Sequence, residues 1–247
     1  MGTKTPNRLA YWQNKNLSIE KPQTFKPNYP ETNVVSMTYD KKSIFYFSPQ
    51  ERIDLIISWV TLSVAFALVI SPIFLQISSL LVSLPIAFVA VGTGFIFHEL
   101  AHREAAKHFG FHSEFRAWYP GLILAVFLAI VSGGRFIFAA PGATYFFGNN
   151  VTRRQNGIIS VAGPITNIIV GTILILLTAI ITDNFIRLVL FQSGMINFWF
   201  ALFNLLPINP LDGSKVITWK TEYWLALMLL SGILVFFPEL IFGLIGI

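Results

Sequence analysis

The sequence contains no cysteine, which excludes disulfide bonds, thiolate metal ligands and a thiol nucleophile. Charged residues are also scarce, at 12% of the 247 residues, whereas 54% are hydrophobic and the mean hydropathy is +0.66. A soluble domain needs far more charge to cover its surface, so the composition predicts a polytopic membrane protein in contact with the lipid bilayer. The net charge of +5 does not indicate a nucleic-acid partner, because no segment combines dense Lys and Arg with aromatic residues.

Residues 1–47 form the only sizeable polar region, and we expect them to be a cytoplasmic N-terminal segment. Four prolines predict that the first thirty or so residues are extended and loosely ordered. Two runs rich in β-branched and aromatic residues flank Asp40-Lys41-Lys42, which favours a β-hairpin over residues 33–47. Residues 48–247 are predicted to form one membrane-embedded domain.

Hydrophobic runs in the second region predict an all-α fold with about five to six transmembrane helices. Ser48-Pro49-Gln50-Glu51 is typical of a helix start, with a Ser cap, Pro at the first helical position and Glu three residues after the cap. Residues 119–133 are apolar but short, so they either cross or re-enter. The aromatic run Phe136–Phe147, broken by Pro141-Gly142, predicts a small membrane-embedded β-hairpin. The expected spans are about 54–76, 81–109, 157–182, 187–206 and 222–246.

Basic residues orient these spans through the positive-inside rule. A cytoplasmic N-terminus, with residues 119–150 entering the membrane and returning, keeps most of the later Lys and Arg on the cytoplasmic side. We therefore predict a multi-pass protein of the cell membrane in that orientation. The basic residues that it places in the cytoplasm are Arg103, Lys107, Arg116, Arg153, Arg154, Lys215 and Lys220.

The motif His98-Glu99-Leu100-Ala101-His102 follows a stretch, residues 55–97, that contains no Asp, Glu, Lys or Arg. Two histidines four residues apart lie on the same face of a helix and can bind one metal ion. The glutamate after the first histidine is free to accept a proton. Because ionisable groups in a membrane span are costly, such a cluster indicates a functional site.

A catalytic zinc site usually has three protein ligands and one open position, so a third ligand is needed. Asp183 falls on the opposite side of the membrane in the predicted topology, and Glu239 lies within the last span. His108 and His112 lie on either side of a helix end predicted at Gly110. Asp212 is the remaining candidate, because it follows an uncharged run and precedes a glycine that lets the backbone turn.

Three motifs together resemble the site-2 protease family of intramembrane zinc metalloproteases. They are His98-Glu99-x-x-His102, Ala162-Gly163-Pro164-x-x-Asn167 and Asn204-x-x-Pro207-x-x-x-x-Asp212-Gly213, and they lie in the family's order within roughly residues 80–220. The resemblance implies a Zn²⁺ ion held by His98, His102 and Asp212, with Glu99 as general base and acid. It also implies that the substrates are membrane-spanning proteins. Residues 48–247 would then be a membrane-embedded metalloprotease domain.

The resemblance leaves the residue that stabilises the oxyanion open. Asn167 and Asn204 are the candidate amide donors, and the motif residues Gly163, Pro164, Pro207 and Gly213 are expected to support the site. The competing interpretation is a metal-binding membrane transporter or scaffold without hydrolytic activity, in which these polar residues form a transit site. A di-iron oxidase is disfavoured because it needs many ligands and the chain has four histidines. The sequence does not indicate an oligomeric state.

Overall fold

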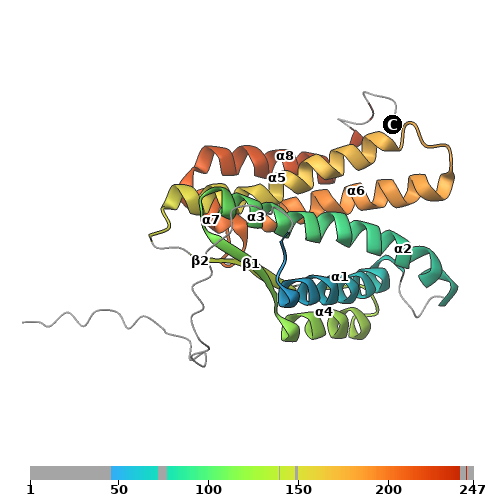
Figure 1. Ribbon diagram of the computed structural model, residues 1–247. Coiled ribbons are helices and arrows are strands. Elements are labelled where there is room, and N and C mark those ends of the chain that lie inside the picture. The colour runs from blue at the N-terminus through green and yellow to red at the C-terminus, as the bar shows by residue number, and fades with distance from the viewer. Residues whose placement is uncertain (1–45, 72–76, 139, 148–149, 240–242, 244–247) are drawn as a thin grey trace, which may run out of the picture. The chain divides into compact units, whose positions relative to one another are not determined.

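The structure is a computed structural model that describes residues 46–71, 77–138, 140–147, 150–239 and 243 (Figure 1). Most of these residues are helical, and one small antiparallel sheet accompanies the helices. The helices are α1 (Pro49–Ile70), α2 (Leu80–Val91), α3 (Phe97–His108), α4 (Tyr119–Val131), α5 (Arg153–Leu177), α6 (Asn184–Asn204), α7 (Asp212–Trp219) and α8 (Thr221–Phe236). A 3₁₀ turn, η2 (Ile77–Ser79), precedes α2, and a π-helical turn, η3 (Gly92–Ile96), joins α2 to α3. The strands are β1 (His112–Ala117) and β2 (Gly142–Phe147).

The polytopic all-α fold predicted from composition is confirmed. Four helical segments are long and apolar enough to cross a membrane: α1, α5, α6 and the continuous stretch Leu80–His108. The apolar helices α4 and α8 are shorter and account for the remaining predicted spans. Helix α7 lies in a region where no helix was predicted. The predicted N-terminal hairpin falls outside the described residues, apart from Tyr46 and Phe47, which are not in a strand.

Local capping explains where several helices begin and end. The Ser48 side chain accepts a hydrogen bond from the Glu51 backbone N–H, as the start motif of α1 predicts. Helix α5 begins with a capping box in which the side chains of Thr152 and Gln155 each bond the other's backbone. Gly110 follows α3 with φ of +80°, a conformation that glycine adopts readily and that ends the helix as predicted.

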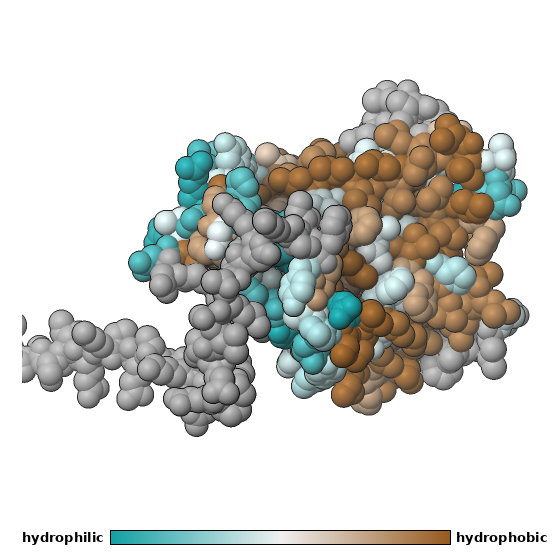
Figure 2. Space-filling view, in the orientation of Figure 1, coloured by the Kyte–Doolittle hydropathy of each residue, from teal (hydrophilic) through white to brown (hydrophobic). Residues whose placement is uncertain are grey.

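Three buried apolar clusters among the described residues hold the helices together, and the smallest joins α3 and α5. The first joins α1, α2 and α4 with Phe115 of β1, and the second joins α5, α6 and α8. Contacts between α2 and α6 connect the two groups (Figure 1). In the space-filling view, hydrophilic residues gather mainly at the end of the molecule that carries β1, α7 and the start of α5, and hydrophobic residues cover most of the helices (Figure 2). This separation suits a helical domain that lies in lipid with one polar end.

The strand pairing differs from the predicted hairpin. β2 pairs antiparallel with β1, from His112↔Phe147 to Ala117↔Gly142, and α4 lies between the two strands in the chain. Residues 136–138 are not in a strand, so the prediction that Phe136–Phe147 folds back on itself at Pro141-Gly142 was wrong. Gly142 has φ of +140° and approaches the backbone of Arg116 too closely for a side chain. The missing side chain of Gly142 therefore allows β1 to pack closely against β2, and this glycine does not form a hairpin turn.

A polar face of α1 covers the other edge of β1. The Glu51 carboxylate accepts the Phe115 N–H at 3.2 Å, and the Asp54 carboxylate accepts the Ala117 N–H at 3.3 Å. Glu51 also forms a buried ion pair of 2.9 Å with Arg103, the residue after His102 in α3. These contacts give two N–H groups on this edge of β1 their acceptors and tie the sheet to α3. Along β2, by contrast, the described part of the chain adds no further strand.

Candidate metal centre and catalytic site

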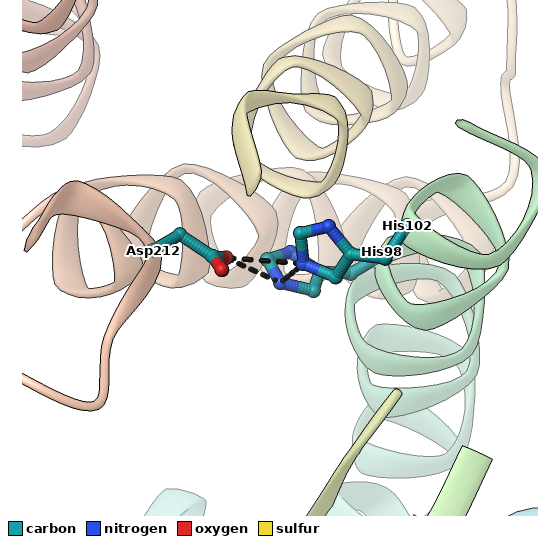
Figure 3. Close-up of side chains that lie close together, drawn as sticks. All are labelled: His98, His102 and Asp212. Carbon is teal, nitrogen blue, oxygen red and sulfur yellow. Dashed lines mark hydrogen bonds and ion pairs between the residues drawn. The ribbon is translucent and has the colours of Figure 1, made fainter. Parts of the chain in front are cut away.

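His98 and His102 of α3 meet Asp212 of α7 at one buried point (Figure 3). The two Nε2 atoms lie 2.9 Å apart, and Asp212 Oδ2 lies 3.2 Å from His98 Nε2 and 3.1 Å from His102 Nε2. The side chain of Asp212 is 13% exposed, so all three ligand candidates are largely shielded from solvent. The tertiary structure thus brings together residues 110 positions apart in the chain.

Hydrogen-bond acceptors at the Nδ1 atoms fix which nitrogen of each imidazole carries the hydrogen. His102 Nδ1 lies 2.8 Å from the carbonyl oxygen of Ile159, which can only accept, so Nδ1 carries the hydrogen. His98 Nδ1 lies 2.6 Å from Asn167 Oδ1. The Asn167 amide nitrogen is identified by its 2.7 Å hydrogen bond to the Gly94 carbonyl, so its oxygen faces His98 and accepts from Nδ1. Both Nε2 atoms therefore present lone pairs to Asp212 and to each other.

This donor set fits a zinc ion. Two imidazole lone pairs and a carboxylate oxygen within about 3 Å of one another repel unless a cation lies among them. Zn²⁺ takes His and carboxylate ligands at about 2.0–2.2 Å, so tetrahedral ligand atoms lie about 3.3–3.6 Å apart, slightly farther than the three atoms here. An ionised carboxylate and neutral imidazoles are the forms in which these side chains bind a metal.

The close packing before α7 positions Asp212. Gly213 lies against the backbone of Leu205 and Leu206, where a Cβ would collide with the Leu205 carbonyl. That carbonyl also accepts a hydrogen bond of 2.7 Å from the indole N–H of Trp224 in α8. Pro207 lies in the exposed loop between α6 and α7. Asp212 and Gly213 therefore begin α7 packed against the Leu205–Leu206 backbone. This packing directs the Asp212 carboxylate at the histidines of α3.

Helix α5 packs directly against the two imidazole rings. A Cβ on Gly163 would lie 2.5 Å from His98 Cε1 and 2.6 Å from the Nε2 atoms of both histidines. Only a residue without a side chain lets α5 approach the imidazoles this closely. Pro164 is buried inside the same helix. The Gly163-Pro164 motif thus shapes the space beside the ligands.

The two candidate amide donors lie in different settings. Asn167 is fully buried, and its amide N–H groups are used by the Gly94 carbonyl and by Asn197 Oδ1 at 3.1 Å. These contacts favour positioning of His98 over donation to a substrate oxyanion. The Asn204 amide donates to the Phe200 carbonyl of its own helix at 3.0 Å. Within the described residues, no hydrogen bond joins Asn204 to the three ligand candidates.

Glu99 is buried beside the ligands and is held by a residue that the sequence did not single out. Thr144 of β2 donates a hydrogen bond of 2.8 Å from its Oγ1 to Glu99 Oε2. Asn197 of α6, which bonds Asn167, was also missed. Neither residue belongs to a recognised motif, and each reaches the site through tertiary packing. A polar residue in an otherwise apolar run is the signal that could have drawn attention to them.

Comparison with known proteins identifies the family. The chain is 42% identical over 193 residues to a protein of Methanocaldococcus jannaschii named as a zinc metalloprotease, MJ0611, and the match covers 74% of this chain and 91% of that relative. The chain belongs to the site-2 protease family of zinc metalloproteases. It is accordingly a membrane-embedded zinc metalloprotease, and Zn²⁺ is its cofactor.

Two further relatives carry the same kind of name. Rip2 of Mycolicibacterium smegmatis is 33% identical over 131 residues, covering 47% of this chain and 49% of that protein. YwhC of Bacillus subtilis is 28% identical over 151 residues, covering 54% of this chain and 68% of that protein. No family model matches the chain, and no solved structure matches it. The membership therefore rests on the sequence relatives.

Proposed function

We propose that this zinc metalloprotease hydrolyses peptide bonds of membrane-spanning protein substrates, with His98, His102 and Asp212 as zinc ligands and Glu99 as general base and acid. One observation carries the proposal: three lone-pair donors converge beside a buried glutamate on helices that suit a membrane. A catalytic zinc site keeps one coordination position open for water or substrate. Three protein ligands leave that position available.

The proposed chemistry divides between the metal and Glu99. When bound, zinc lowers the pKa of a water molecule towards neutrality and polarises the scissile carbonyl. Glu99 accepts the proton that water loses as its oxygen bonds to the carbonyl carbon. Glu99 then gives that proton to the amine nitrogen as the C–N bond breaks, so the products are a carboxylic acid and an amine. Thr144 holds the Glu99 carboxylate in position for both transfers.

We further propose that the edge of β2 with which no described strand pairs receives the substrate as an added strand. Backbone N–H groups alternate between the two edges of a strand. Phe115 and Ala117 donate theirs to α1, so their partners Thr144 and Gly142 have backbone groups that face away from β1. An unwound substrate segment could pair there, beside the Thr144 side chain that reaches Glu99. The docking edge is therefore β2, which pairs with β1 and carries Thr144 next to Glu99, and not a Phe136–Phe147 hairpin.

The same proposal includes the orientation of the protein. We place it in the cell membrane with a cytoplasmic N-terminus and a site that opens towards the cytoplasm. The support is the distribution of Lys and Arg along the chain. Cysteine residues introduced singly near residue 150 and near residue 183 would test it, because a membrane-impermeant thiol reagent should label only the latter from outside the cell.

Cleavage of a model membrane-spanning substrate by wild type and by Glu99→Gln tests the activity. The proposal expects turnover to fall by at least about a hundredfold in the variant, since general acid–base catalysis contributes 10²–10⁴-fold. Metal analysis should find one zinc per chain in both proteins. Equal cleavage by the two proteins, or a substrate cut only by a contaminating protease insensitive to zinc removal, would refute it and favour the transporter or scaffold interpretation.

A further inference from the structure

The π-helical turn η3 interrupts the span immediately before the metal-binding motif. A π turn accommodates one extra residue compared with an α-helix, and such turns are frequent at functional sites. Each α-helical residue advances the chain by about 100° around the axis, so one residue more or fewer redirects everything that follows. The direction in which His98 points from its helix therefore depends on keeping η3 as it is.

Side chains from two other helices hold this turn. Asn167 of α5 donates to the Gly94 carbonyl at 2.7 Å, and Asn197 of α6 donates to the Thr93 hydroxyl oxygen at 2.9 Å. The Thr93 hydroxyl in turn donates to the Val89 carbonyl at 2.8 Å. A π turn disturbs the regular pairing of the backbone. These bonds give its polar groups partners inside the protein.

In the hydrogen bonds that join Asn197, Asn167 and His98, each donor and each acceptor can be assigned. Asn197 Nδ2 donates to the Ser193 carbonyl at 2.8 Å, which identifies its amide nitrogen and leaves its oxygen facing Asn167. Asn167 Nδ2 thus has two acceptors, Asn197 Oδ1 and the Gly94 carbonyl. Asn167 Oδ1 is left to accept from His98 Nδ1. Backbone carbonyls fix the orientation of both amides, and the orientation passes to the imidazole.

We propose that Asn197 is a positioning residue for the metal centre, which acts through Asn167 and through the π turn to keep the Nε2 lone pair of His98 directed at zinc. A rotated Asn167 amide would direct its oxygen at two acceptor oxygens and its NH₂ group at His98 Nδ1. His98 would then have to carry its hydrogen on Nε2, where it blocks metal binding. Asn197 supplies one of the two oxygens that oppose this rotation. Asn197 is fully buried, so water does not compete with these bonds.

This inference deepens the proposed function, since it rests on zinc bound by His98, but its test requires no proteolysis. The full-length protein in detergent is purified as wild type, Asn197→Ala, Thr93→Val and Ser193→Ala. Zinc affinity is measured by competition with a chelator, and the visible absorption spectrum of the Co²⁺-substituted protein reports ligand geometry. Ser193→Ala is the matched control, because this buried hydroxyl lies one turn earlier in α6 and has no hydrogen-bond partner within the described residues.

The expected loss of zinc affinity is about tenfold for Asn197→Ala, at the lower end of the range for residues that orient metal ligands. Thr93→Val is near-isosteric and should show a smaller loss, because it removes only the far end of the network. Both variants should shift the Co²⁺ spectrum, whereas Ser193→Ala should match wild type. Wild-type affinity and spectrum in Asn197→Ala, or equal changes in Ser193→Ala, would overturn the inference. If Asn197→Ala does not fold, an unchanged spectrum in Thr93→Val overturns it, and a shifted one supports it.

Discussion

At the scale of single residues, the centre depends on groups that orient others. His98 and His102 each donate from Nδ1 to a fixed oxygen, and Gly163 lets α5 approach both rings. Glu99 is oriented by Thr144, whose hydroxyl is 2.8 Å from the carboxylate. Such partners decide whether a ligand or a base presents the correct atom.

Thr144→Val should reduce kcat because it removes the donor to Glu99 and keeps the shape of the side chain. A hydrogen bond to a charged group contributes about 1.5–3 kcal/mol, which corresponds to a roughly tenfold to hundredfold loss. Thr144→Ser keeps the hydroxyl and should retain most of the activity. Steady-state kinetics with a membrane-spanning substrate would check this, together with zinc analysis of each variant. If Val and Ser behaved alike, the hydroxyl would not be what positions Glu99.

At the scale of secondary-structure elements, the small sheet joins α1 to α3, the helix that carries the candidate base Glu99. The carboxylates of α1 occupy one edge of β1, β2 occupies the other, and β2 carries Thr144 to α3. Among the described residues, α1 holds one side of the sheet and no strand pairs with the other side, which is the arrangement that strand addition requires.

Ala143→Pro should abolish cleavage while zinc stays bound. Ala143 of β2 lies opposite Arg116 of β1, and its N–H faces β1. Proline at this position removes one hydrogen-bond donor from the β1–β2 pairing. Ala143→Ser changes the exposed side chain but keeps the N–H, so it is the matched control and should cleave like wild type. Cleavage assays and metal analysis of both variants test the role of the sheet. Full activity in Ala143→Pro would exclude β2 as the docking edge.

At the scale of the whole molecule, the metal centre connects parts of the chain that are far apart in sequence. Two ligand candidates come from α3 and the third from α7, while α5 packs against both helices. A zinc ion held by α3 and α7, as we propose, would bind the folded protein and not the unfolded one. Such an ion would add to the free energy of unfolding as well as to catalysis.

Chelation of zinc should lower the thermal unfolding temperature and stop cleavage, and added Zn²⁺ should restore both. Free zinc at 100 times its Kd contributes about 2.7 kcal/mol to the stability of the folded state. Asp212→Ala should unfold at a temperature that responds much less to the chelator, because one of three ligands is gone. Thermal unfolding followed by intrinsic fluorescence would measure these shifts. If the chelator left the unfolding temperature of the wild type unchanged, that result would contradict a zinc ion bridging α3 and α7.

The sequence by itself determined the membrane class, the approximate positions of the long helices and the ligand candidates. Long uncharged runs and the spacing of His98 and His102 act through local chemistry and helical periodicity, which any window of sequence contains. Caps such as Ser48 and the glycine after α3 are equally local. Asp212 could be proposed because few other ionisable residues were available on its side of the membrane.

Only the tertiary structure decided what surrounds those residues. The partner of β2, the contact between Thr144 and Glu99, and the links from Asn197 through Asn167 to His98 all join segments separated by many residues. Strand pairing depends on which edge is free once α1 has bonded β1, and no local pattern records that competition. The orientation of an amide likewise depends on backbone carbonyls brought to it by other helices. The candidate metal ligands could be predicted from the sequence, whereas the residues that orient them became visible only in the fold.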